Sequence, residues 1–105
     1  MHKIFVRKIK KGGKEKLEAW GEKLMGERKE EAIKSLQQEN VQQERTWIVE
    51  IQGEKYFIAY MESQDKNILE MNKDMPINKD HASVLKECLE WPLPVSDLYD
   101  ITLDK

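Results

Sequence analysis

Cysteine is almost absent from this sequence, and long apolar runs are missing altogether. The single cysteine, Cys88, excludes an intrachain disulfide and argues against a cysteine-based metal site. No stretch approaches the roughly 20 apolar residues of a membrane-spanning helix. The first residues also lack the apolar segment of a signal peptide. These absences predict a cytoplasmic protein that has no membrane partner.

A basic excess is missing too. The chain carries 18 Lys and Arg against 20 Asp and Glu, for a net charge of −2. Nucleic-acid binding needs cations gathered on one face to neutralise phosphates, so no nucleic-acid partner is expected. With two histidines, no H-E-x-x-H spacing and no glycine-rich phosphate loop, the sequence also predicts no metal and no cofactor.

What remains is enough for one domain over residues 1–105. The composition is 39% hydrophobic and 36% charged, which is polar for a globular protein. Such a chain must concentrate its apolar residues efficiently, or share some of them with a partner subunit.

Hydrophobic periodicity divides the chain into strands and helices. Leu17, Trp20 and Leu24 form one helical stripe, and Pro76, Pro92 and Pro94 are each expected to end a helix. Asn78 is expected to cap the last helix. The predicted strands cover 2–10, 41–51, 55–63 and 97–103, and the predicted helices cover 14–25, 28–39, 65–74 and 78–90.

This order predicts an α+β protein with a ferredoxin-like βαββαβ arrangement. Two crossovers would place the helices on one face of a four-stranded antiparallel sheet. Residues 56–61 form an unbroken apolar run, which is typical of a strand covered on both faces. Because helices cover only one face in this arrangement, the sequence predicts a homodimer whose second copy covers the other.

Several short motifs resemble those of an uncharacterised bacterial family of unknown function in the dimeric α/β-barrel superfamily. They are the Lys11-Gly12-Gly13-Lys14-Glu15 turn, Trp20 on the first helix, Tyr60 on an aromatic strand, Pro76-Ile77-Asn78-x-x-His81, and Leu98-Tyr99-Asp100. The resemblance implies a homodimer whose two sheets form a barrel with an interior cavity. The superfamily includes monooxygenases, sugar mutarotases, haem proteins and stress-response proteins, so its fold is a weak guide to chemistry. The first helix has no histidine, which argues against a mutarotase-like site.

His81 is the strongest catalytic candidate, with Tyr60 as its partner. It falls on the apolar side of the last helix, and histidine titrates near neutral pH. It can serve as a general base or bind a ligand at a cavity wall. The alternative is a half-buried histidine bonded to Tyr60, Tyr56 or a backbone carbonyl.

Tyr56 and Trp47 lie on neighbouring hairpin strands and could line a ligand pocket, as could Trp20 on the first helix. A dimer interface is the alternative, since it also favours aromatic residues. Glu44 shares a strand face with Glu50, and Arg7 and Arg45 could pair with them.

These carboxylates could act in acid–base chemistry or form a solvated, ion-paired strand face. Cys88 lies two helical turns from His81, about 10 Å along the helix axis, so a nucleophilic pair is not expected. Cys88 is interpreted as core packing.

Three functions remain open at this point. The first is a homodimeric barrel that binds a small molecule. The second is a cofactorless enzyme, an isomerase or monooxygenase-like protein, that uses His81 and Tyr60. The third is a non-catalytic interaction dimer. An enclosed, partly polar pocket reached by His81 and Tyr60 would support the first two, and a sheet interface filled by side chains would support the third.

Overall fold

The computed structural model describes residues 1–63 and 67–103, which contain four strands and three helices. The elements are β1 (His2–Ile9), α1 (Gly13–Met25), α2 (Lys29–Gln38), β2 (Gln43–Ile51), β3 (Glu54–Glu62), α3 (Pro76–Cys88) and β4 (Leu89–Leu93). Three predicted strands and three predicted helices are confirmed, with small changes at their ends.

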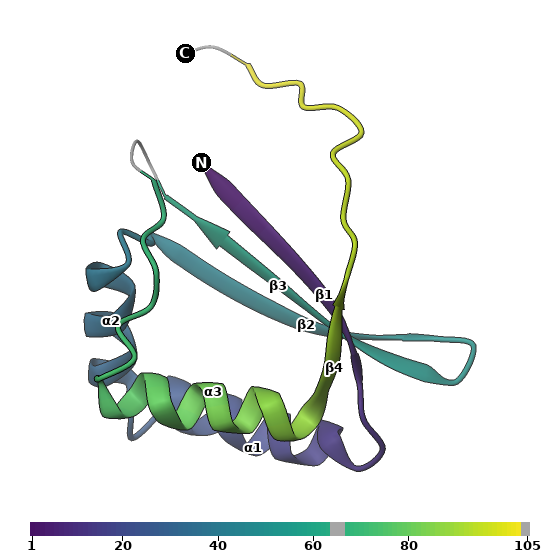
Figure 1. Cartoon of the computed structure of the whole chain (residues 1–105), viewed down its shortest axis with the longest axis horizontal. Coiled ribbons are helices and arrows are strands. Elements are labelled where there is room, and N and C mark those ends of the chain that lie inside the picture. Colours follow the sequence, from purple (N-terminus) through teal and green to yellow (C-terminus); the bar gives the residue numbers. More distant parts are fainter. Residues whose placement is uncertain (64–66, 104–105) are drawn as a thin grey trace.

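The strands form one antiparallel sheet in the order β2-β3-β1-β4. Figure 1 shows the three helices together on one face of this sheet, with α1 and α3 side by side. The predicted α+β class and one-sided helix layer are therefore confirmed, and the arrangement is compatible with a ferredoxin-like fold.

The core lies between the sheet and the helices. Phe57 and Ala59 of β3 are buried in one cluster with Leu17 of α1 and Cys88 of α3. Residues paired across antiparallel strands share a face, so the partners of these two residues define the helix-facing side of the sheet. Those partners are Phe5 and Arg7 on β1 and Thr46 and Ile48 on β2.

The opposite side of the sheet is called here the open face. Tyr56, Ile58 and Tyr60 alternate with the core residues of β3 and therefore point to this side. No element of the described chain packs over them (Figure 1). The large apolar residues of the open face are Ile4, Val6, Trp47, Val49, Ile51, Tyr56, Ile58, Tyr60 and Leu93, and its charged residues are Lys8, Arg45, Glu54 and Glu62.

The last strand is not where the sequence placed it. β4 begins directly after α3 and pairs with β1, with Pro92 opposite Arg7. The prolines were expected only to end the helix. A proline is tolerated here because β4 is an edge strand, where its missing N–H costs no ladder hydrogen bond.

Residues 97–103, predicted as a strand, form no secondary structure. They belong to an extended segment, residues 94–103, which is called the arm below. Its apolar side chains are largely exposed, with Leu98 at 89% and Leu103 at 91%. The predicted strand is wrong, because the arm has no strand partner in the described chain.

The predicted helix over 65–74 is also wrong for residues 67–74, which are irregular; residues 64–66 lie outside the described residues. Its backbone is bound instead by the end of α2, since Leu69 N–H donates to Glu39 O at 2.9 Å. Pro76 starts α3 rather than stopping a helix, in the first-turn position that suits proline. Met75, not Asn78, is the N-cap residue.

Candidate functional site

His81 is held by Trp20 across the helix layer. Trp20 Nε1–H donates to His81 Nδ1 at 2.9 Å, linking α1 to α3. Trp20 itself is only 8% exposed. Accepting at Nδ1 requires an unprotonated nitrogen, so this bond selects the neutral imidazole with its hydrogen on Nε2.

The electrostatics of His81 point the same way. Burial lowers the pKa of His81, because removal from water disfavours the charged imidazolium. No hydrogen bond to His81 Nε2 occurs within the described ranges 1–63 and 67–103. His81 is therefore a neutral, half-buried imidazole with one N–H donor left for a ligand or water.

Arg28 forms the outer side of this pair. Its guanidinium lies over the Trp20 ring, 5.5 Å from the centroid. It also makes two 3.0 Å hydrogen bonds to Glu31 and an ion pair with Asp80. These carboxylates raise the pKa of Arg28, which stays charged. Arg28 thus packs on the outer face of Trp20, whose indole N–H binds His81.

Tyr60 is not next to His81. It lies on the open face, whereas His81 belongs to the helix layer on the other side of the sheet. The Tyr60 hydroxyl donates to Glu62 at 3.1 Å, and its ring stacks on His2. Burial and the nearby Glu62 raise the pKa of Tyr60. Within one chain, the fold does not bring the two predicted catalytic residues together.

The ligand-binding candidates also divide between the two sides. Tyr56 and Trp47 share the open face with Tyr60, and Arg45 lies over the Trp47 ring at 5.1 Å. Trp20 lies with His81 in the helix layer.

Arg7 and Glu44 lie on the helix-facing side of the sheet. Arg7 does not pair with either glutamate; its Nε–H donates to Glu90 O at 2.6 Å. Glu50 faces Lys55 at 3.7 Å, as expected for an ion-paired strand face.

The helix layer also contains a buried carboxyl group that was not predicted from the sequence. Glu39, at the C-terminal end of α2, is 7% exposed, and burial raises its pKa. Glu44 has a raised pKa as well, from partial desolvation and the proximity of Glu39. Glu44 remains an exposed residue, so Glu39 carries the stronger argument. The four-residue spacing from Ser35 on α2 was the available sequence signal.

Oxygen atoms of Glu39, Ser35 and Asn78 lie in a row, each within hydrogen-bond distance of the next. When Glu39 is ionised, one hydroxyl hydrogen must serve both contacts. Ser35 Oγ lies 2.9 Å from Glu39 Oε2 and 2.6 Å from Asn78 Oδ1. The Asn78 amide is oriented by its own Nδ2–H, which donates to Asn72 O. A serine hydroxyl has one hydrogen and can donate to one acceptor at a time. Both contacts are hydrogen bonds together only when Glu39 is protonated and donates to Ser35.

We expect Glu39→Gln to be more stable than the parent at pH 8 by about 1 kcal/mol, because an amide supplies the missing donor. A raised carboxyl pKa contributes stability that is complete below the unfolded value of about 4.3 and is lost as the pH rises through the folded value. The advantage of Glu39→Gln should therefore vanish at low pH. Urea unfolding from pH 4 to 8 measures it.

The opposite pH dependence of His81 is common to both proteins and cancels in this comparison. Its lowered pKa contributes stability above about 6.5 that is lost on acidification. An unchanged difference between Glu39→Gln and the parent across the whole pH range would show that Glu39 is ionised in the folded protein.

Two hollows lie beside the arm. The first, about 220 Å³, is lined by His2, Lys3, Ile4, Phe5, Val95 and Asp97. The second, about 420 Å³, lies between His2 and arm residues. Among the described residues, no group of three His, Cys, Asp or Glu side chains is placed to hold a metal ion. None of the helices described is long and apolar enough to cross a membrane.

The fold and these contacts define an α+β protein with a four-stranded antiparallel sheet and a helix layer containing a bonded histidine. The chain belongs to a family of unknown function, DUF6176, which it matches over residues 3–99. Neither a curated protein nor a solved structure matches the chain. The family match agrees with the sequence resemblance in giving an uncharacterised family, and it assigns no activity.

Proposed function

We propose that this protein is a homodimer that binds a small molecule at the helix layer, with His81 as the polar anchor. The observation that carries the proposal is the neutral His81 imidazole, which Trp20 binds at Nδ1 and which leaves Nε2–H available. A half-buried donor of fixed tautomer is suited to a carbonyl or carboxylate oxygen of a ligand.

The helix-facing side of the sheet could supply an apolar wall for such a ligand. Phe5 and Ile48 point to this side, yet they remain 40% and 36% exposed. The helices therefore cover this side incompletely. An apolar ligand body with one acceptor oxygen matches apolar walls and a single donor.

The dimer is supported by the open face. Large apolar side chains remain exposed there, including Trp47 at 40% and Ile51 at 55%. Contiguous apolar surface of this kind marks interaction sites in soluble proteins. A second copy of the chain placed against this face would bury these side chains and give the homodimer that the sequence resemblance implies.

A cofactorless enzyme is the weaker alternative. It requires His81 to act with Tyr60, and within one chain these residues lie on opposite sides of the sheet. Binding without catalysis needs only His81 and its own surroundings.

A fragment screen by NMR tests the proposal. Water-soluble aromatic acids and amides are added to ¹⁵N-labelled protein, and the Trp20 indole N–H and His81 ring signals are followed. We expect a subset to shift both signals with a Kd near 1 mM, about 4 kcal/mol of binding energy. His81→Gln should weaken binding of those fragments by roughly tenfold or more.

His2 supplies the matched control, because it is the other histidine, lies on β1 and stacks on Tyr60. His2→Gln should leave fragment binding unchanged. Fragments that shift only Trp47 would move the site to the open face. Equal binding by His81→Gln and the parent would remove His81 from the proposal.

A further inference from the structure

The arm is an apolar segment that lacks a binding surface in its own chain. Val95, Leu98, Tyr99, Ile101 and Leu103 are between 48% and 91% exposed. Five large apolar side chains within nine residues would normally be buried. By the period of two, Tyr99, Ile101 and Leu103 share one side of the extended chain.

The sheet of the same chain is too short to cover this segment. Val6 pairs with Leu93 and Arg7 with Pro92, so antiparallel continuation would place Asp97 opposite His2. The sheet ends at that level, where His2 and Gln43 both pair with Glu62. Residues 98–103 would extend about 20 Å further.

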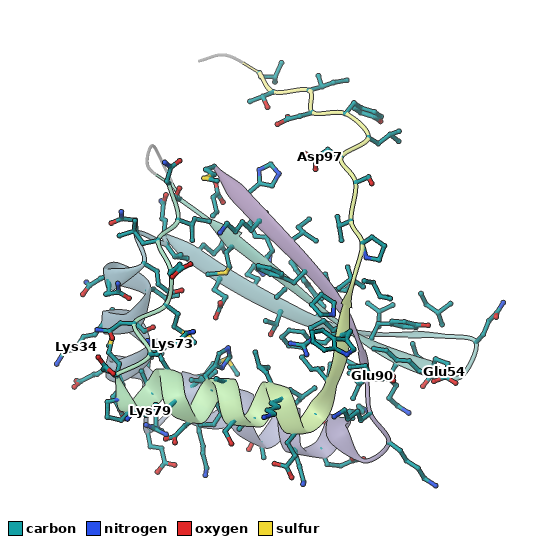
Figure 2. The ribbon with its side chains drawn as sticks, viewed as in Figure 1. Lys34, Glu54, Lys73, Lys79, Glu90 and Asp97 are labelled. Atoms are coloured by element: carbon teal, nitrogen blue, oxygen red, sulfur yellow. The ribbon has the colours of Figure 1, made fainter. Side chains whose placement is uncertain are left out.

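The path of the arm agrees with the limited length of the sheet. The arm separates from β1 after Leu93, leaving the 220 Å³ hollow between Ile4 and Val95. Figure 1 shows the arm continuing past the N-terminal end of β1, and Figure 2 shows Asp97 on it, far from Lys34 and Lys79 on the helices.

The geometry points to reciprocal exchange of the arms between two copies of this chain. Residues 98–103 of each copy lie on the open face of the other, with Tyr99, Ile101 and Leu103 against its exposed apolar residues. This inference rests on the dimer of the proposed function and specifies what completes it.

We favour a second copy of the chain as the partner on the open face, because each chain carries both surfaces of the contact, the arm and the open face. One copy offers an uncovered arm and an uncovered sheet face, and a twofold axis satisfies both pairs at once.

Charge gives this pairing a local anchor. The arm carries Asp97 and Asp100, and the open face carries Arg45 and Lys8 alongside Glu54 and Glu62. Lys8 already contacts Glu54, which leaves Arg45 as the exposed cation for an acidic arm. Unlike charges across the contact steer association and fix its register.

Sedimentation equilibrium of the full chain and arm variants tests the exchange. The parent should sediment at twice the 12.5 kDa of one chain at micromolar concentration. Ile101→Asp should raise the dimer dissociation constant about thirtyfold or more, as when a central apolar contact of an interface is lost. Thr102→Asp is the control, since it adds the same charge on the other side of the arm and should change the constant much less.

The outcomes separate this inference from the dimer itself. A monomeric parent overturns both, while leaving the fragment test at His81 valid. A parent dimer that Ile101→Asp leaves intact overturns the exchange alone.

An isotope-filtered NOE experiment on mixed labelled and unlabelled chains then identifies the occupant. Contacts between Ile101 or Leu103 of one copy and Trp47 or Ile58 of the other support exchange. The same contacts within one copy show that the arm folds back on its own sheet, and overturn it.

Discussion

Trp20→Ala is expected to lower the free energy of unfolding by about 3–5 kcal/mol, the range for removal of a large buried aromatic side chain. Trp20 is 8% exposed and contacts two other parts of the helix layer, His81 of α3 and Arg28. Its ring packs in the core side of α1, its indole N–H binds His81, and Arg28 lies over its face. Thermal unfolding should show a fall in Tm of roughly 12–20 °C.

Trp91 is the matched control for this substitution. It is 87% exposed on β4, so Trp91→Ala should change stability by no more than about 0.5 kcal/mol. Both variants are compared with the parent at one protein concentration, because the stability of a dimer depends on concentration. Equal losses for the two tryptophans would mean that Trp20 is not an anchor of the helix layer.

Trp20→Phe separates the hydrogen bond from the packing. Phenylalanine keeps most of the ring but cannot donate to His81 Nδ1. The pKa of His81 should rise in this variant, because the bond to the neutral imidazole is gone. NMR titration of His81 measures the change; an unaltered His81 pKa would show that burial alone sets it.

The sequence predicted the elements whose signal is local. The alternation along β2 and the apolar stripe of α1 each depend on one segment, and both were confirmed. The run from Tyr56 to Met61 predicted a strand covered on both faces. The helix-covered face is confirmed by burial of Phe57 and Ala59, and cover over the Tyr56 face stays a prediction.

The errors concern partners that are distant in the chain. Whether Leu89–Leu93 or 97–103 pairs with β1 depends on the length left after α3, and both segments are apolar enough to be strands. Residues 67–74 have a helical pattern, but the end of α2 supplies their hydrogen bonds. Local periodicity cannot decide between such alternatives.

In the candidate site, too, the sequence identified single residues but not their partners in the fold. His81 was identified from its residue type and its position on the helix, but its partner Trp20 is 61 residues away and was not predicted. Tyr60 was predicted to act with His81. Side chains alternate along β3, so Tyr60 points away from the core once Phe57 faces it. The sequence alone does not show which of the two faces the core.

Gly13→Ala is expected to destabilise the protein by about 1–3 kcal/mol, although alanine is normally favoured in helices. Gly13 is the first residue of α1 and lies against the junction of α3 and β4. A Cβ at this position would lie 2.8 Å from Cys88 O and 3.0 Å from a methyl group of Ile9. Cys88 is fully buried, so neither it nor its backbone can move without disturbing the core.

Gly21→Ala is the opposite case within the same helix. A Cβ there meets no atom within 4 Å, so this variant should gain about 0.5–1 kcal/mol from the higher helix propensity of alanine. The two substitutions add the same methyl group to α1 and should shift the urea midpoint in opposite directions. Stabilisation by Gly13→Ala would mean that α1 does not approach Cys88 this closely, since only the contact with the Cys88 backbone reverses the normal preference.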